Sequence, residues 1–128
     1  MHHIPKDLYY TKSHEWIKFT DGGALIGITD FAQNAMGDVV FVNLCPEGDT
    51  LETDDSLGDI ESIKAVSEIY APLAGTVARV NQDVLDAPGD LNTKPYDAWL
   101  VELSGDFDKD SPGLMTPEAY EAFLQEEA

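Results

Sequence analysis

The sequence has a single cysteine, Cys45, among its 128 residues. One cysteine excludes a disulfide within the chain, and it leaves no cluster of thiolates for a zinc or iron–sulfur site. Cys45 lies between Leu44 and Pro46, where we expect an inert, half-buried thiol. The chain therefore has neither a disulfide framework nor a thiolate metal site.

Basic residues are also scarce. Seven Lys and Arg residues stand against 25 Asp and Glu residues, which gives a formal net charge of −18 at pH 7. A surface of this charge repels nucleic acid and anionic lipid, so we expect neither a nucleic acid nor a membrane as a partner. The acids keep the surface solvated, and the same charge attracts basic docking surfaces on partner proteins.

Long apolar runs are absent. No stretch is apolar over the length that crosses a bilayer, and the first ten residues lack the apolar core of a signal peptide. We therefore expect a cytoplasmic protein, or a mitochondrial matrix protein if the chain is the processed form of a eukaryotic one. The length and a 43% content of hydrophobic residues fit one domain over residues 1–128. His2 and His3 are assigned no role.

Turn residues divide most of the sequence into short strands, the pattern of a mostly β sandwich or barrel. Strands are expected over 15–19 and 24–28, joined by the hairpin turn Asp21-Gly22-Gly23. The run over 39–44 is nearly all apolar, so we expect both of its faces to be buried. The remaining predicted elements are strands over 57–63, 66–70, 75–80 and 98–103, and a loop over 86–96.

Capping residues predict two helices. Thr29 or Asp30 begins a short internal helix that ends before Gly37, a residue suited to the left-handed position at a helix end. Thr116-Pro117-Glu118 begins a C-terminal helix with the cap, the proline and the acid in their preferred order.

Residues 60–69 form a near palindrome, Ile-Glu-Ser-Ile-Lys-Ala-Val-Ser-Glu-Ile. A hairpin with a two-residue loop, Lys64-Ala65, would place like residues opposite each other. The expected pairs are Ile63 with Val66, Ser62 with Ser67, Glu61 with Glu68, and Ile60 with Ile69. Opposed glutamates destabilise a hairpin by up to ~1 kcal/mol, which hints at a functional purpose for these acids. Lys64 is expected to be exposed at the tip.

Two sets of motifs carry a resemblance to known families. The segment 58–65, followed by Ala71-Pro72-Leu73-Ala74-Gly75, resembles the modification hairpin of biotinyl and lipoyl carrier domains. A more specific likeness covers nearly the whole chain. In order and spacing, its motifs resemble those of the H proteins of the glycine cleavage system: Tyr10-Thr11-Lys12-Ser13-His14-Glu15-Trp16, Gly27-Ile28-Thr29-Asp30, Gly37-Asp38-Val39-Val40-Phe41-Val42, Glu61-Ser62-Ile63-Lys64, and Pro95-Tyr96 with Trp99-Leu100.

This resemblance implies a barrel-sandwich hybrid, in which two antiparallel sheets are accompanied by a short internal helix and a C-terminal helix. It also implies lipoate in amide linkage to Lys64. In such a protein the cofactor does the chemistry and the chain supplies attachment and placement. We therefore expect a carrier with no catalytic residues and no metal site.

The resemblance further implies four protein partners. They are a pyridoxal-phosphate-dependent glycine decarboxylase, a tetrahydrofolate-dependent aminomethyltransferase, dihydrolipoyl dehydrogenase, and a lipoate-attaching enzyme. The carrier would move the aminomethyl group of glycine from the first enzyme to the second, and the dehydrogenase would reoxidise the arm. A tether raises the effective concentration of the arm at each docked enzyme. We expect the carrier itself to be a monomer.

In the H-protein family a cleft shelters the loaded arm, and its residues fall here on Ser13, Glu15 and Glu68. Carboxylates suit a cationic amine, although each acid taken alone also fits an ordinary surface position. This sequence departs from the family at Phe31, where many members have histidine. It also shortens the Pro-Tyr-x-x-Gly-Trp segment, which reads 95–99 here without the glycine.

Other functions remain open from the sequence. Biotin carriers usually flank the lysine with methionines, whereas Ile63 and Ala65 stand here, which disfavours biotin. An H-like depot or relay that passes lipoate to other enzymes needs the same modified lysine, so the sequence separates it poorly from a glycine cleavage carrier. A hydrolase is not supported, because no nucleophile–base constellation or metal-ligand spacing is found.

Overall fold

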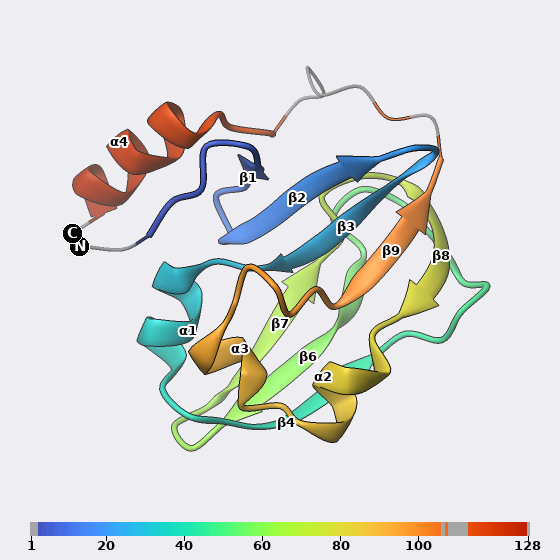
Figure 1. Ribbon diagram of the computed structural model, residues 1–128, viewed down its shortest axis with the longest axis horizontal. Coiled ribbons are helices and arrows are strands. Elements are labelled where there is room, and N and C mark those ends of the chain that lie inside the picture. The colour runs from blue at the N-terminus through green and yellow to red at the C-terminus, as the bar shows by residue number, and fades with distance from the viewer. Residues whose placement is uncertain (1–2, 106, 108–112, 128) are drawn as a thin grey trace.

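The computed structural model describes residues 3–105, 107 and 113–127 (Figure 1). In this part of the chain, two antiparallel sheets enclose the core. The larger sheet has the order β1 (Tyr9–Tyr10), β2 (Glu15–Thr20), β3 (Gly23–Ile28), β9 (Val101–Ser104), β8 (Gly75–Val80) and β5 (Thr50–Leu51). The smaller sheet has the order β4 (Val39–Leu44), β6 (Ser56–Ser62) and β7 (Val66–Tyr70). The helices are α1 (Asp30–Met36), α2 (Gln82–Asp86), α3 (Asp90–Thr93) and α4 (Pro117–Glu127). The prediction of two antiparallel sheets with an internal and a C-terminal helix is confirmed.

Two apolar clusters hold these layers together. The main cluster lies between the sheets and includes the fully buried Ile26, Ile60 and Leu103. The second cluster lies under α4 and is built around Trp16 and Tyr120. Burying one large apolar side chain contributes roughly 1.5–3 kcal/mol, so these residues dominate the stability of the fold.

Helix caps form as the sequence predicts. The Thr29 hydroxyl accepts a hydrogen bond of 3.2 Å from the Ala32 amide at the start of α1, and Gly37 ends that helix with φ of 78°. The Thr116 hydroxyl accepts one of 3.2 Å from the Ala119 amide at the start of α4. Each such cap stabilises its helix by about 1 kcal/mol.

Strand β4 is not buried on both faces, contrary to the prediction. Val39 and Val42 point into the core, whereas Val40 is 55% exposed and Phe41 50% exposed. An irregularity in the pairing with β6 lies between Val39 and Phe41, at the point where the exposed Val40 and Phe41 follow each other. The apolar run therefore has one buried side, with Val39 and Val42, and one exposed side, with Val40 and Phe41.

The segment 86–96 is not a plain loop, again contrary to the prediction. Helix α2 ends within it, and α3 lies entirely inside it. Asn81 caps α2 through its side chain, which accepts a hydrogen bond of 3.1 Å from the Asp83 amide. Val84 and Leu91 anchor the two helices in the core. The next strand, predicted to begin at residue 98, begins at Val101.

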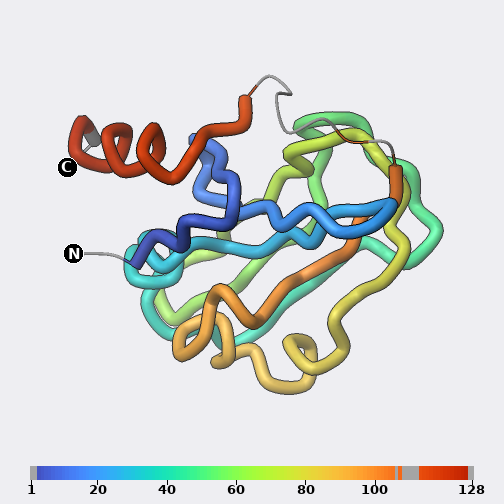
Figure 2. The backbone as a smooth tube through the Cα atoms, turned by 45° about the horizontal axis from the view of Figure 1, so that its top comes forward, coloured from blue at the N-terminus to red at the C-terminus, as the bar shows by residue number. Residues whose placement is uncertain are grey.

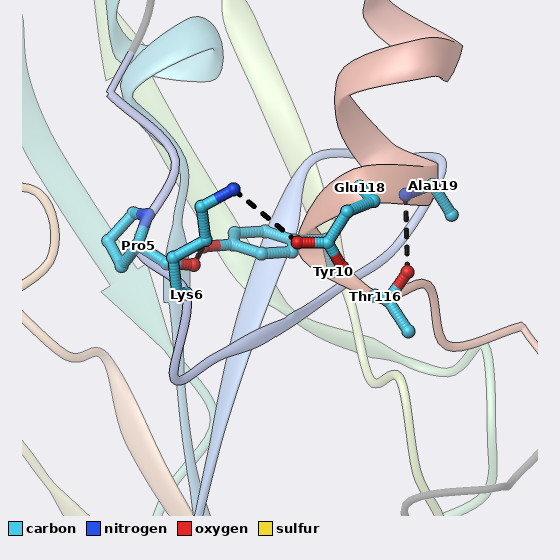
Figure 3. A network of polar contacts seen from close by, with 6 residues as sticks. All are labelled: Pro5, Lys6, Tyr10, Thr116, Glu118 and Ala119. Atoms are coloured by element: carbon cyan, nitrogen blue, oxygen red, sulfur yellow. Dashed lines mark hydrogen bonds and ion pairs between the residues drawn. The ribbon is translucent and has the colours of Figure 1, made fainter.

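Helix α4 lies beside the N-terminal segment, as both views of the backbone show (Figures 1 and 2). The Tyr10 and Tyr120 rings stack with centroids 4.7 Å apart and planes 8° from parallel. Close by, the Tyr10 hydroxyl donates a hydrogen bond of 2.6 Å to the Pro5 carbonyl (Figure 3). The ion pair between Lys6 and Glu118 spans 3.4 Å and is well exposed, so it contributes little. The buried rings therefore hold this helix in place.

Candidate functional site

The hairpin between β6 and β7 does not have the predicted two-residue loop. Its last strand pair is Glu61 with Val66, which leaves Ser62, Ile63, Lys64 and Ala65 as a four-residue loop. The other observed pairs are Ile60 with Ser67, Asp59 with Glu68, Gly58 with Ile69, and Ser56 with Tyr70. All four predicted pairs are therefore wrong, including the opposition of Glu61 and Glu68. Glu68 still faces an acid, and that acid is Asp59.

Ser62 builds the loop. Its hydroxyl accepts hydrogen bonds from the amides of Lys64, at 3.2 Å, and Ala65, at 3.3 Å. Its own amide donates to the Ala65 carbonyl at 2.8 Å. Side-chain bonds of this kind substitute for the glycine that tight turns usually require. Lys64 is thereby held at an exposed tip, as predicted.

The connection between α1 and β4 supports the tip from one side. The Ile63 amide donates a hydrogen bond of 3.0 Å to the Asp38 carbonyl. A Cβ atom added to Gly37 would lie 3.3 Å from Cε of Lys64. Gly37 is therefore placed both to end α1 and to leave room for the aliphatic part of the lysine.

We expect Gly37→Ala to lower stability and to crowd Lys64. The backbone there has φ of 78° and ψ of −160°, a region that costs a residue with a side chain about 1–3 kcal/mol. Urea denaturation should show a loss of that size, and the initial rate of lysine acylation should fall. Gly22→Ala is the matched control, because Gly22 has the same φ of 78° and open space around it. Equal acylation rates in both variants would contradict the crowding of Lys64.

Lys64 opens onto a cavity of about 370 Å³. The cavity lies between α1, β7 and the segment before β2, and Ser13 and Glu68 line it together with Lys64. Its walls also include the apolar side chains of Ile28, Phe31 and Met36. The structure thus brings together three of the four residues assigned to the site from the sequence.

Glu15, the fourth of these residues, lies in a neighbouring cavity of about 380 Å³, which it shares with Thr11, Asp54 and Ser13. Ser13 lines both cavities. The Glu15 side chain is only 1% exposed, so it is not a surface acid. Its Oε1 accepts hydrogen bonds of 2.6 Å from the Thr11 hydroxyl and 2.9 Å from the Ser13 hydroxyl.

The other carboxylate oxygen of Glu15, Oε2, is buried and has no hydrogen-bond partner among the residues that the structure describes. Burial has the largest effect on the pKa of Glu15 and raises it. The hydroxyls of Thr11 and Ser13 and the backbone at Tyr70 lower the pKa by less. A buried carboxylate oxygen without a partner carries a desolvation cost that a cationic or hydrogen-bonding group would relieve. The arrangement can therefore accept an amine.

Three residues near the site had no role in the site assigned from the sequence. Ser62 forms the loop, Gly37 makes room for Lys64, and Tyr120 contacts His14 beside Ser13 with 2.8 Å between the Tyr120 hydroxyl and Nδ1 of His14. The centroid of the His14 ring lies 4.5 Å from that of the Phe31 ring. The serine could have been recognised from its position before a turn. Tyr120 is 106 residues away from His14 in the sequence, so no local sequence pattern could indicate this contact.

Over the described ranges, no group of three or more His, Cys, Asp and Glu side chains is placed to hold a metal ion. No helix in the same ranges is long and apolar enough to cross a membrane. Neither finding bears on the lysine and its two cavities.

Comparison with known proteins gives a consistent result. The family model described as glycine cleavage H-protein matches residues 8–127. The glycine cleavage system H protein of Oceanobacillus iheyensis is 47% identical over 124 residues, which cover 96% of this chain and 98% of that protein. The H protein of Listeria welshimeri is 48% identical over 122 residues, with 94% and 98% covered.

A solved structure agrees with the sequence comparisons. The crystal structure of a glycine cleavage system H protein from Mycobacterium marinum superposes with a TM-score of 0.81 and 37% sequence identity. The superposition covers 98% of this chain and 100% of that one. With an exposed lysine on a hairpin loop in a fold that matches over its whole length, the chain belongs to the glycine cleavage H-protein family, whose members are non-catalytic lipoyl carriers.

Proposed function

We propose that this chain carries lipoate in amide linkage on Lys64 and shuttles the aminomethyl group of glycine between enzymes of the glycine cleavage system. The observation that carries the proposal is the position of Lys64. It lies on an exposed loop built by Ser62 and opens onto a cavity that also contains Ser13 and Glu68. Membership of the H-protein family supports the same function over a lipoate depot or a biotin carrier.

The residues around Lys64 fit lipoate. An amide bond at Nζ removes the ammonium charge and leaves an aliphatic tether. Ile28, Phe31 and Met36 give the adjacent cavity apolar walls, which suit such a chain. When bound, lipoate supplies the disulfide that accepts and releases the one-carbon unit. Lys64 itself only fixes the point from which the arm reaches out.

The acids of the site suit the amine of the cargo. Oε2 of Glu15 is buried without a hydrogen-bond partner in the described part of the chain, and a cationic amine would supply one. Glu68 lies in the cavity of the lysine, and the Ser13 hydroxyl stands between the two cavities. We propose that these three residues hold the amine of the loaded arm and limit its exposure to water.

The proposed partners are the pyridoxal-phosphate-dependent decarboxylase, the tetrahydrofolate-dependent aminomethyltransferase, dihydrolipoyl dehydrogenase and a lipoate-attaching enzyme. The net charge of −18 favours approach to basic surfaces on these enzymes, because opposite charges accelerate encounter. The carrier is proposed to act as a monomer in the cytoplasm, or in the mitochondrial matrix if it is a processed eukaryotic protein.

Reconstitution tests this function. The lipoylated chain should support glycine-dependent exchange of labelled bicarbonate by a glycine decarboxylase, whereas the lipoylated chain alone should give none, because the proposed carrier supplies attachment and the decarboxylase supplies the chemistry. The unlipoylated chain is the control and should stay at background. Lack of exchange with the lipoylated chain, together with transfer of its lipoyl group to other acceptor domains, would favour a depot or relay instead.

A further inference from the structure

The hydroxyl of Tyr120 links the C-terminal helix to the segment that carries Ser13 and Glu15. It lies 2.8 Å from Nδ1 of His14 and 2.8 Å from Oγ1 of Thr29. Tyr120 is fully buried on α4. One hydroxyl therefore bridges the residue between Ser13 and Glu15 and the residue that caps α1.

The segment from Thr11 to Glu15 is a tight loop in which His14 has an unfavourable backbone conformation. His14 has φ of 70°, a left-handed value that residues with side chains seldom adopt. The His14 amide donates to the Thr11 carbonyl at 3.1 Å, and the Thr29 amide donates to the His14 carbonyl at 3.1 Å. Such a conformation persists where the surroundings hold it.

The imidazole ring of His14 belongs to the residue that connects this loop to the cavity of Lys64. It lies 4.5 Å from the ring of Phe31 and 5.9 Å from that of Phe123, measured between centroids. His14 and Phe31 both line the cavity, next to Ser13. A shift of the His14 ring would therefore move the wall of the cavity and the two residues that flank His14 in the chain.

We propose that Tyr120 is a positioning residue, which acts through His14 to hold the 13–15 segment in the conformation that presents Ser13 and Glu15 to the two cavities. The consequence for the cargo rests on the function proposed above. The C-terminal helix thus serves the site although none of its described residues lines either cavity.

Removal of this hydroxyl should leave α4 in place. The Tyr120 ring would still stack on Tyr10 at 4.7 Å, and the cap formed by Thr116 would remain. The bridge between Tyr10 and Met115, with amide-to-carbonyl distances of 2.9 and 2.7 Å, also holds the chain just before the helix. Tyr120→Phe therefore tests the hydroxyl alone.

Hydrogen exchange of the unlipoylated chain gives the direct readout. In Tyr120→Phe, exchange of the His14 and Glu15 amides should become about two- to tenfold faster, the range expected for one lost hydrogen bond. The amides of β3 report global opening and should accelerate by similar amounts in Tyr120→Phe and in Tyr10→Phe, because each variant loses one tyrosine hydroxyl contact. Tyr10→Phe is the matched control, because it removes another buried tyrosine hydroxyl, which bonds to the Pro5 carbonyl. Unchanged His14 and Glu15 rates in Tyr120→Phe, or equal increases in both variants, would overturn the proposal.

Loss of the aminomethyl group from the loaded, lipoylated carrier gives a second readout. It should be faster in Tyr120→Phe and unchanged in Tyr10→Phe. Faster amide hydrogen exchange at His14 and Glu15 without faster loss of the aminomethyl group would support the positioning of the 13–15 segment. The same result would refute the shelter of the arm by Ser13 and Glu15. Faster loss without faster exchange would refute the positioning role. Hydrogen exchange therefore tests the positioning role of Tyr120, and the loss of the aminomethyl group tests the shelter of the arm.

Discussion

Lys64→Arg should gain no lipoyl mass on incubation with lipoate, ATP and a lipoate ligase, whereas the unchanged chain gains one. Arginine keeps the positive charge and nearly the length of lysine, so the loop built by Ser62 should remain folded. The guanidinium group stays protonated and offers no free amine for acylation. Intact-mass spectrometry measures the gain in mass directly, and we expect the lipoyl gain to be lost completely in Lys64→Arg.

Controls for this experiment come from the chain itself. Lys12 and Lys18 are exposed lysines outside the hairpin, and Lys12→Arg and Lys18→Arg should each gain the full lipoyl mass. A biotin ligase with biotin should add nothing to the unchanged chain, which separates lipoyl from biotinyl attachment. A lipoyl mass gain in Lys64→Arg would show that another residue is the attachment point.

Replacement of both Glu15 and Glu68 by glutamine should speed the loss of the aminomethyl group from the loaded carrier by about tenfold or more, because hydrogen bonds to charged groups contribute roughly 1.5–3 kcal/mol each. Release of formaldehyde and ammonia from the isolated loaded carrier measures the rate. Glu15→Gln alone should have the larger effect, since Glu15 is buried and Glu68 is exposed.

The fold should tolerate this change. Burial raises the pKa of Glu15 above its ordinary value of 4.5, so the folded chain retains a proton there that the unfolded chain has lost. The contribution of this group to stability therefore declines as the pH rises above about 4.5 toward the folded-state pKa. Glutamine is neutral at every pH and removes that decline. Glu121→Gln, on the exposed face of α4, is the control, and a decay rate equal to that control would count against the shelter.

Strong local signals made part of the fold predictable. The hairpin of β2 and β3, closed by Thr20 paired with Gly23, follows from the glycine-rich turn. The caps at Thr29 and Thr116 follow from the preference of hydroxyls for the free amides at helix starts. In each case a few neighbouring residues carry all of the necessary chemistry.

The register of the site hairpin was not predictable from the palindrome. Ile60 pairs with Ser67 and not with Ile69, a displacement of two residues along β7. Side chains alternate with a period of two, so this displacement leaves each one on the same face. The hydrophobic pattern fits both registers equally well. The hydrogen bonds of the Ser62 hydroxyl to the loop amides favour the longer loop, and they form only within the folded turn.

The family resemblance assigns Lys64, Ser13 and Glu68 to one site, and they line one cavity. Glu15 was assigned with them, but its place in a second cavity depends on long-range packing. The same holds for Tyr120, which meets His14 only because the C-terminal helix returns to the start of the chain. Contacts of this range follow from the complete fold and from no local pattern.

The four-residue loop has a consequence for how the attachment point tolerates change. In a strand, each side chain is assigned to a face by its position in the pleat, and a slip by one residue turns every side chain over. Lys64 lies beyond the last pair of the β6–β7 ladder. Its direction is set by the Ser62 hydroxyl and by the space at Gly37. Substitutions in the paired parts of β6 and β7 that preserve the hairpin should therefore leave the direction of Lys64 unchanged. That direction depends on Ser62 and Gly37, which lie outside the β6–β7 ladder.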